Sequence, residues 1–258
     1  MSETGRKKVG LIGCGTIGSR IARTIMERDL ADIVFVCDLD EKRVRQAVAG
    51  AKYVSDLAAL PCAEVDIVIE TANADVVRAV ALDILRHCDF LPFTVTAMAD
   101  AEFYDAVKRQ CEESGTHLYI PHGGILGLDG IHDGRNVIHE VTFRTIKNPK
   151  NLGLKPSQVG TIFDGTTREA CRLFPRNVNV HATLALMGVG FDRQRSIIIS
   201  DPDTKKMSHE ITVVGDGLEW KLTLSSMALA GVTGSYTPES AASTVTRVLG
   251  GERGIVVA

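Results

Sequence analysis

Apolar residues in the first half of the chain occur in short continuous runs, separated by segments with helical periodicity. Such runs are typical of strands that are buried on both faces of a parallel sheet. Ile17, Ile21 and Ile25 recur every four residues after the first run, which predicts an apolar helix face. The pattern predicts strands at 9–12, 32–38, 65–72 and 90–98, and further helices at 75–88 and 101–113.

The pattern changes after about Ile125. Partial alternation of apolar and polar residues predicts strands at 137–146, 195–203, 209–216 and 218–227, with one helix among them at 182–189. A last helix is predicted at 238–251, with Pro238 in its first turn, where proline is favoured. We therefore expect a Rossmann-type α/β domain with a parallel sheet, formed by 1–122 and 235–258. The remainder, 123–234, is expected to form an α+β domain with a mostly antiparallel sheet.

The first apolar run leads into the sequence GCGTIG, in which Gly13, Gly15 and Gly18 have the G-x-G-x-x-G spacing. In a dinucleotide-binding turn, the first glycine permits the tight turn and the second lets the backbone approach a pyrophosphate. The third lets the following helix pack closely on the strand. Backbone amides of the first helical turn, here at Thr16 and Ile17, favour phosphate binding. A glycine-rich turn without a ligand is the alternative interpretation.

Asp38 ends the next apolar run, twenty residues after Gly18. A carboxylate there can accept hydrogen bonds from the adenosine ribose, and it would repel a 2′-phosphate. Asp38 therefore favours NAD over NADP, with NADP as the second candidate cofactor. The alternatives for Asp38 are a solvated acid at a strand end, or a cap for the segment that follows.

Composition narrows the function classes. Of the 258 residues, 45% are hydrophobic and 24% are charged, and the formal net charge is −3, so neither a nucleic-acid nor a membrane partner is expected. The first residues lack the apolar segment of a signal peptide, which predicts a cytoplasmic protein. The six cysteines form no C-x-x-C pair, so we expect reduced thiols and no metal site.

Three stretches of the second half are more specific than the glycine turn: YIPHGGILGLDGI at 119–131, FPRNVNVHATLAL at 174–186 and SDPDTKKMSHEI at 200–211. Together they resemble the L-aspartate dehydrogenase family of NAD(P)-dependent amino acid dehydrogenases. The resemblance covers nearly the whole chain. It implies oxidation of an acidic amino acid, with L-aspartate converted through an imine to oxaloacetate and ammonia.

The resemblance also implies roles for single residues. His209 matches the catalytic histidine of the family, while Asn179 and Gly124 match positions that contact the cofactor. Histidine suits the reaction because it can accept and return protons near neutral pH. The family implies a homodimer too, with 123–234 as the substrate and dimerisation domain. A local hydrogen bond for His209 and a helix cap for Asn179 are the alternatives.

The chain departs from the family pattern at two histidines. His122 stands where the family usually has serine, and His181 stands where it usually has alanine. The segment 225–240 also lacks both of the usual asparagines and the first of the usual prolines. We therefore expect His122 and His181 in the substrate pocket; a loop or helix histidine with local hydrogen bonds is the alternative for each. A related amino acid or imine as the substrate, or a non-catalytic dinucleotide sensor, are the alternative functions.

Overall fold

The computed structural model describes residues 6–229 and 234–250 and divides the chain into two compact units. The first unit contains residues up to Thr94, Ala101–Pro121 and the chain from Pro238 onwards. The second contains Val95–Asp100 and His122–Thr237. The second unit differs from the expected domain 123–234 because it also contains Val95–Asp100, His122 and residues 235–237.

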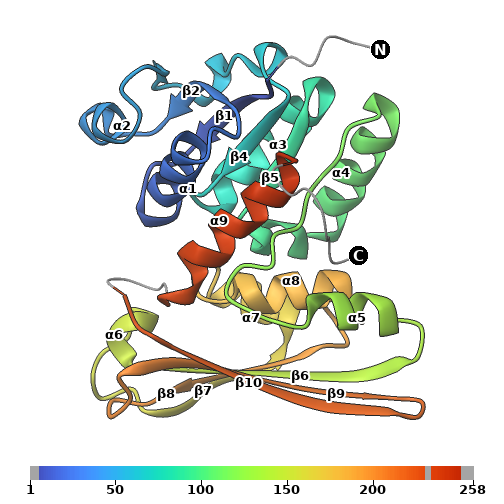
Figure 1. Cartoon of the computed structure of the whole chain (residues 1–258). Coiled ribbons are helices and arrows are strands. Elements are labelled where there is room, and N and C mark those ends of the chain that lie inside the picture. Colours follow the sequence, from blue (N-terminus) through green and yellow to red (C-terminus); the bar gives the residue numbers. More distant parts are fainter. Residues whose placement is uncertain (1–5, 230–233, 251–258) are drawn as a thin grey trace. The chain divides into compact units, whose positions relative to one another are not determined.

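The elements of the first unit alternate between strand and helix (Figure 1). They are β1 Lys8–Ile12, α1 Thr16–Glu27, β2 Asp32–Cys37, α2 Glu41–Ala47, β3 Lys52–Val54, the short 3₁₀ helices Leu57–Ala59 and Cys62–Glu64, β4 Ile67–Glu70, α3 Ala74–His87, β5 Asp89–Pro92 and α4 Ala101–Ser114. The strands form a parallel sheet in the order β3-β2-β1-β4-β5, which confirms the predicted Rossmann-type fold.

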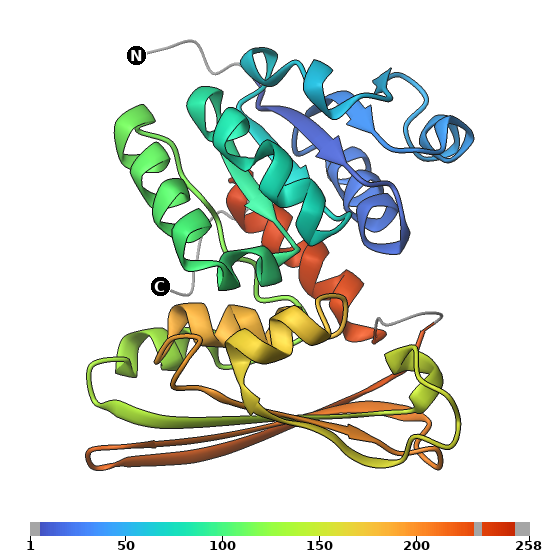
Figure 2. The ribbon, with the colours of Figure 1, turned by 180° about the vertical axis from the view of Figure 1, so that it is seen from behind.

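Helices cover both faces of this sheet. Apolar residues of α1, including Ile21 and Ile25, pack on Val9 and Leu11 of β1. Helices α3 and α4 pack against each other on the other face of the sheet, which is turned towards the viewer in Figure 2. Burial on both sides is the reason that β1 and β4 are apolar without alternation.

The C-terminal helix α9, Tyr236–Val248, completes the first unit. Ala241, Val245 and Leu249 belong to the same apolar core as the strands β1 and β4. The chain thus returns to the first domain, as the sequence predicted. Residues 230–233, part of the segment that departs from the family pattern, lie outside the described residues.

The second unit is a sheet with helices on one face (Figure 1). Its strands are β6 Ile138–Lys147, β7 Gly160–Thr166, β8 Arg195–Ser200, β9 Lys206–Gly215 and β10 Leu218–Met227, in the order β10-β9-β6-β8-β7. Its helices are the 3₁₀ helix Val95–Ala99, α5 Leu128–Gly134, α6 Pro149–Leu152, α7 Thr167–Leu173 and α8 Asn179–Met187. Only β6 and β8 pair in parallel, so the predicted mostly antiparallel sheet is confirmed.

Some predicted elements were wrong or missing. The strand predicted at 90–98 ends at Pro92, where its partner β4 also ends at Glu70, and Val95–Ala99 is a 3₁₀ helix. The sequence pattern missed β3, β7 and three helices of the second unit. These elements have three to seven residues each, too few to establish a periodicity.

Candidate active site

The glycine turn connects β1 to α1, and two of its glycines are required by the protein itself. Gly13 has a φ of +88°, and a Cβ atom there would lie 3.0 Å from the backbone of Thr71. A Cβ atom on Gly18 would overlap the carbonyl oxygen of Gly13. Both positions therefore exclude a side chain because the turn and the helix approach each other closely.

Gly15 is different, since a Cβ atom there would meet no protein atom within 4 Å. Gly15 is also the N-cap of α1, and no side chain caps this helix end. The amides of Thr16 and Ile17 follow in the first helical turn. An open cradle beside a helix N-terminus without a side-chain cap fits the pyrophosphate of NAD(P).

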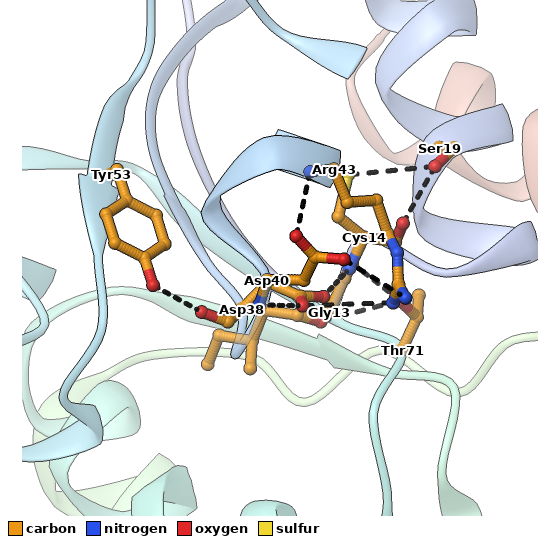
Figure 3. A network of polar contacts seen from close by, with 9 residues as sticks. Gly13, Cys14, Ser19, Asp38, Asp40, Arg43, Tyr53 and Thr71 are labelled. Atoms are coloured by element: carbon orange, nitrogen blue, oxygen red, sulfur yellow. Dashed lines mark hydrogen bonds and ion pairs between the residues drawn. The ribbon is translucent and has the colours of Figure 1, made fainter. Parts of the chain in front are cut away.

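Asp38 follows the last residue of β2 and joins this strand end to the glycine turn (Figure 3). Its Oδ2 accepts a 2.6 Å hydrogen bond from the Cys14 amide, and its Oδ1 accepts one of 2.9 Å from the Asp40 amide. Asp40, and not Asp38, caps helix α2 by accepting from the Arg43 amide. Asp38 thus caps the turn that follows β2 through the Asp40 amide, but it does not cap helix α2. Its ribose contact stays a prediction.

Two residues that the sequence analysis missed support the same turn. Thr71 donates from its hydroxyl to the Gly13 carbonyl at 2.9 Å, and Tyr53 donates to the Asp38 carbonyl at 3.1 Å (Figure 3). The sheet order explains both contacts. Strand β4, which precedes Thr71, lies beside β1, and the short strand β3, which contains Tyr53, lies beside β2. Neither contact has a signal in the sequence, because each joins residues that are far apart in the chain.

Glu70 is a further residue that the sequence analysis missed. Its buried carboxylate accepts hydrogen bonds from the Ala72 amide at 2.5 Å and from the Thr94 hydroxyl at 2.9 Å. It thereby joins the loops that follow β4 and β5. Burial raises the pKa of Glu70 to about 7, although these hydrogen bonds lower it. A carboxylate at the end of the apolar run VDIVIE was the available signal.

His209 lies on β9 in the second unit, with 8% of its surface exposed. Its Nδ1 is 2.9 Å from the hydroxyl of Thr145, which is its cross-strand neighbour on β6. The ring also meets Phe143 edge-on, with 5.6 Å between the ring centroids. Burial, with a smaller contribution from the charge of Lys147, lowers the pKa of His209 to about 3. His209 is therefore neutral at physiological pH.

His181 is linked to His209 by two hydrogen bonds through the Thr145 hydroxyl. Its Nε2 is 2.6 Å from the Thr145 hydroxyl, and its Nδ1 is 2.9 Å from the Ser196 hydroxyl. The ring stacks on Phe143 at 3.9 Å and has no exposed surface. These contacts place His181 in the interior of the second unit. Its expected position in the substrate pocket stays a prediction.

Lys147 is a buried cation on the same face of β6 as Thr145, and the sequence analysis missed it. Its ammonium group is 3.4 Å from the Asn177 carbonyl. Burial lowers the pKa of Lys147 to about 8. Its charge contributes to the lowered pKa of both His181 and His209. An inward-facing lysine in an alternating strand was the signal in the sequence.

The other expected site residues also lie in the second unit. Asn179 begins α8, but the N-cap is Val178, and the Asn179 side chain instead accepts a 3.1 Å hydrogen bond from the Thr96 amide. The helix-cap alternative was therefore wrong. Gly124 is buried, and a Cβ atom there would lie 2.8 Å from the Thr237 hydroxyl. The cofactor contacts of Asn179 and Gly124, and the pocket position of His122, stay predictions.

Residues 6–229 and 234–250 contain no group of three or more histidine, cysteine, aspartate or glutamate side chains that could hold a metal ion. None of the helices in the same ranges has the length and apolar character needed to cross a membrane.

Comparison with known proteins gives the family. Residues 129–248 match the family model of the aspartate dehydrogenase C-terminal domain, and residues 13–121 match that of the homoserine dehydrogenase NAD binding domain. L-aspartate dehydrogenases of Methanosarcina acetivorans and Methanosarcina barkeri are 33% and 36% identical to the chain, each over 81% of this chain and 84% of the relative.

A solved structure agrees with these relatives. The crystal structure of aspartate dehydrogenase from Thermotoga maritima superimposes with a TM-score of 0.79 and 25% identity, covering 98% of this chain and all of that one. Sequence and fold thus agree over both units, and the resemblance noted in the sequence is confirmed. The chain belongs to the L-aspartate dehydrogenase family.

Proposed function

We propose that the protein is an NAD-dependent L-aspartate dehydrogenase, which oxidises the CH–NH₂ group of L-aspartate to an imine that hydrolyses to oxaloacetate and ammonia. Family membership over four-fifths of the chain supports the reaction class. The single observation that carries the proposal is the buried His209, whose Nδ1 alone is hydrogen-bonded among the described residues.

His209 is proposed as the catalytic proton acceptor. Thr145 occupies Nδ1, and Nε2 has no hydrogen-bond partner among the described residues. A neutral imidazole with an available nitrogen can accept a proton from the substrate nitrogen, or from the water that attacks the imine. His209 returns that proton in the reverse direction.

An acidic substrate fits the charges around His209. The pKa of His209 is low because the imidazolium would be buried near the Lys147 cation. A bound dicarboxylate would oppose the charge of Lys147 and raise the pKa of His209 towards neutrality. The substrate would thereby convert a weak base into an effective one. An amino acid with one carboxylate would bring less negative charge and would raise the pKa of His209 less.

The cofactor is proposed to bind at the turn between β1 and α1. When bound, NAD accepts the hydride that leaves the substrate Cα. Gly15 leaves the space for the pyrophosphate, and Asp38 supports NAD in preference to NADP through its negative charge. Arg43 lies 3.9 Å from the Asp38 carboxylate, and half of its side chain is exposed, so it could pair with a 2′-phosphate once Asp38 is neutral.

A homodimer is proposed through the sheet face of the second unit that no described helix covers (Figure 2). On this face Ile146 pairs with Ile199, and Arg144 pairs with Ile197, so apolar side chains lie beside a charged one. The ion pair Arg144–Glu210 lies on the same face at 2.9 Å. Light scattering of wild type and Ile199→Lys tests this: a monomeric wild type would contradict it.

The compartment is proposed to be the cytoplasm. The six cysteines are free, and five of them are buried, as expected for thiols used as small core residues. This usage fits a reducing compartment.

The test of the proposed function is a substrate panel followed by NADH absorbance. L-aspartate with NAD, and oxaloacetate with ammonium and NADH in the reverse direction, should give turnover. L-glutamate, L-asparagine and L-alanine serve as comparisons of charge and length. Faster turnover of another amino acid would favour the alternative substrate, and NAD binding without turnover of any would favour a sensor.

A further inference from the structure

A continuous chain of polar side chains runs from His209 into the second unit. Its successive contacts are His209 Nδ1–Thr145 Oγ1 at 2.9 Å, Thr145 Oγ1–His181 Nε2 at 2.6 Å, His181 Nδ1–Ser196 Oγ at 2.9 Å, Ser196 Oγ–Thr167 Oγ1 at 2.7 Å and Thr167 Oγ1–Gln194 Nε2 at 3.0 Å. All six side chains are buried. Their protons are therefore exchanged among fixed partners and not with bulk water.

Gln194, the last side chain of this hydrogen-bonded row, is held by fixed partners. Gln194 donates from Nε2 both to Thr167 and to the His181 carbonyl, the latter at 2.9 Å. The Thr167 hydroxyl can in turn donate to the backbone carbonyl oxygen of Gln194, 3.2 Å away. Because an amide nitrogen only donates, Thr167 must accept from Gln194. This leaves the single Thr167 proton for either Ser196 or the Gln194 carbonyl.

The hydroxyl of Thr145 couples the two histidines, since it has one proton and lies between two ring nitrogens. If it donates to His181, then His209 must donate from Nδ1, and both rings carry their proton on Nδ1. If it donates to His209, then His181 donates from Nε2, and both rings carry their proton on Nε2. A mixed pair leaves one buried polar group without a partner.

The two arrangements differ by one hydrogen bond. With both protons on Nδ1, His181 donates to Ser196, Ser196 to Thr167, and Thr167 to the Gln194 carbonyl. With both protons on Nε2, Thr167 turns its proton towards Ser196 and the bond to the Gln194 carbonyl is lost. The Gln194 backbone carbonyl accepts from the Thr167 amide at 3.0 Å in both arrangements, so it stays paired in each. The first arrangement is favoured because it contains one more hydrogen bond.

We propose that His181 is a positioning residue that, through Thr145, holds His209 in the tautomer with its proton on Nδ1 and its lone pair on Nε2. This inference rests on the proposed catalytic role of His209. No bond is formed or broken in this role: His181 selects one of two neutral tautomers. It also explains a histidine at a position where the family pattern leads one to expect alanine.

The experiment reads the tautomers directly, without substrate. Long-range ¹H–¹⁵N spectra of protein labelled in its histidine rings should show the proton on Nδ1 in both His209 and His181, assigned with His209→Gln and His181→Ala. Thr145→Val, which keeps the shape and removes the hydroxyl, should shift His209 towards the Nε2–H tautomer that free histidine prefers. Thr145→Ser, the matched control, should retain the Nδ1–H form.

Ser196→Ala tests the coupling from the far side and serves where Thr145→Val does not fold. It removes the acceptor of the His181 Nδ1–H, so both rings should lose Nδ1–H character. Once a substrate is known, His181→Ala should lower kcat by at least about tenfold with little change in KM, because His209 spends less time in the required tautomer.

Two results would overturn the inference: an Nε2–H tautomer of His209 in the wild type, or a His209 tautomer that is the same in folded wild type, Thr145→Val and Ser196→Ala. Absence of dehydrogenase activity with coupled Nδ1–H tautomers would instead count against the proposed function alone. The spectroscopic result therefore separates the two.

Discussion

The Asp38 carboxylate accepts a 2.6 Å hydrogen bond from the backbone N–H of Cys14, the second residue of the glycine turn. A residue expected to recognise the cofactor thus also holds the loop that is proposed to bind the cofactor phosphates. The side chain is about one-tenth exposed, so the protein already takes up most of its surface. Substitutions of Asp38 must therefore separate its charge from its hydrogen bond.

Asp38→Asn should reduce the preference for NAD over NADP, because the negative charge is gone. Its amide oxygen can still accept from the Cys14 amide, although the bond from the Asp40 amide is lost. NADP affinity should rise as Arg43 becomes available to a 2′-phosphate. Asp38→Ala removes the hydrogen bond too and should weaken both cofactors. Titration of each protein with NADH and NADPH by fluorescence checks this. A wild type that binds NADPH more tightly would contradict the role given to Asp38.

Gly15→Val should abolish cofactor binding in a folded protein. The new side chain meets no protein atom, so it enters the space proposed for the pyrophosphate. Gly50→Val is the matched control, since its Cβ atom also meets nothing and Gly50 is exposed. Circular dichroism and NADH titration measure fold and binding. Equal NADH affinity in both variants would place the phosphates elsewhere.

His209→Gln and His209→Ala should lower kcat by about 10²–10⁴-fold, the usual contribution of one general acid–base group. The dissociation constant for NADH should barely change, because the glycine turn belongs to the other unit. Steady-state kinetics with L-aspartate and NAD, together with NADH titration, test this. Near-normal turnover of both variants would remove His209 from the mechanism.

The pH dependence of the rates should distinguish the free protein from its substrate complex. With a pKa of about 3 in the free protein, His209 should add no acid limb to kcat/KM above about pH 5. The bound dicarboxylate raises this pKa, so kcat should show an acid limb at higher pH than kcat/KM. Profiles from about pH 5 to 10 decide it, and coincident acid limbs would show that the substrate does not raise the pKa.

Folding stability should fall on acidification because of the same histidine. The folded pKa of His209 is about 3, below the unfolded value of about 6.5, so between these values only the unfolded chain takes up the proton. From about pH 7.5 to pH 5, His209 should cost the wild type about 2 kcal/mol of unfolding free energy that His209→Gln does not lose. Urea unfolding of both proteins at both pH values measures this. Equal losses of unfolding free energy in the wild type and in His209→Gln would indicate that His209 is solvated.

The sequence by itself determined the Rossmann-type unit and the glycine turn between β1 and α1. Continuous apolar runs, a helix with isoleucines every four residues, and three spaced glycines are local patterns, and each has one main structural solution. Gly13 and Gly18 lie where the turn and the helix touch, and Asp38 follows the end of β2. The position of His209 on a strand could likewise be predicted from the local alternation of apolar and polar residues.

Only the tertiary structure decided what surrounds His209. Thr145 reaches it through the pairing of β6 with β9, and His181 reaches the same hydroxyl from helix α8. Lys147 and Glu70 owe their shifted pKa values to burial, which depends on the packing of elements distant in the sequence. A histidine that looks like a pocket residue in the sequence is enclosed because β6, β8 and α8 meet there, and long-range pairing of this kind leaves no periodic trace in the chain.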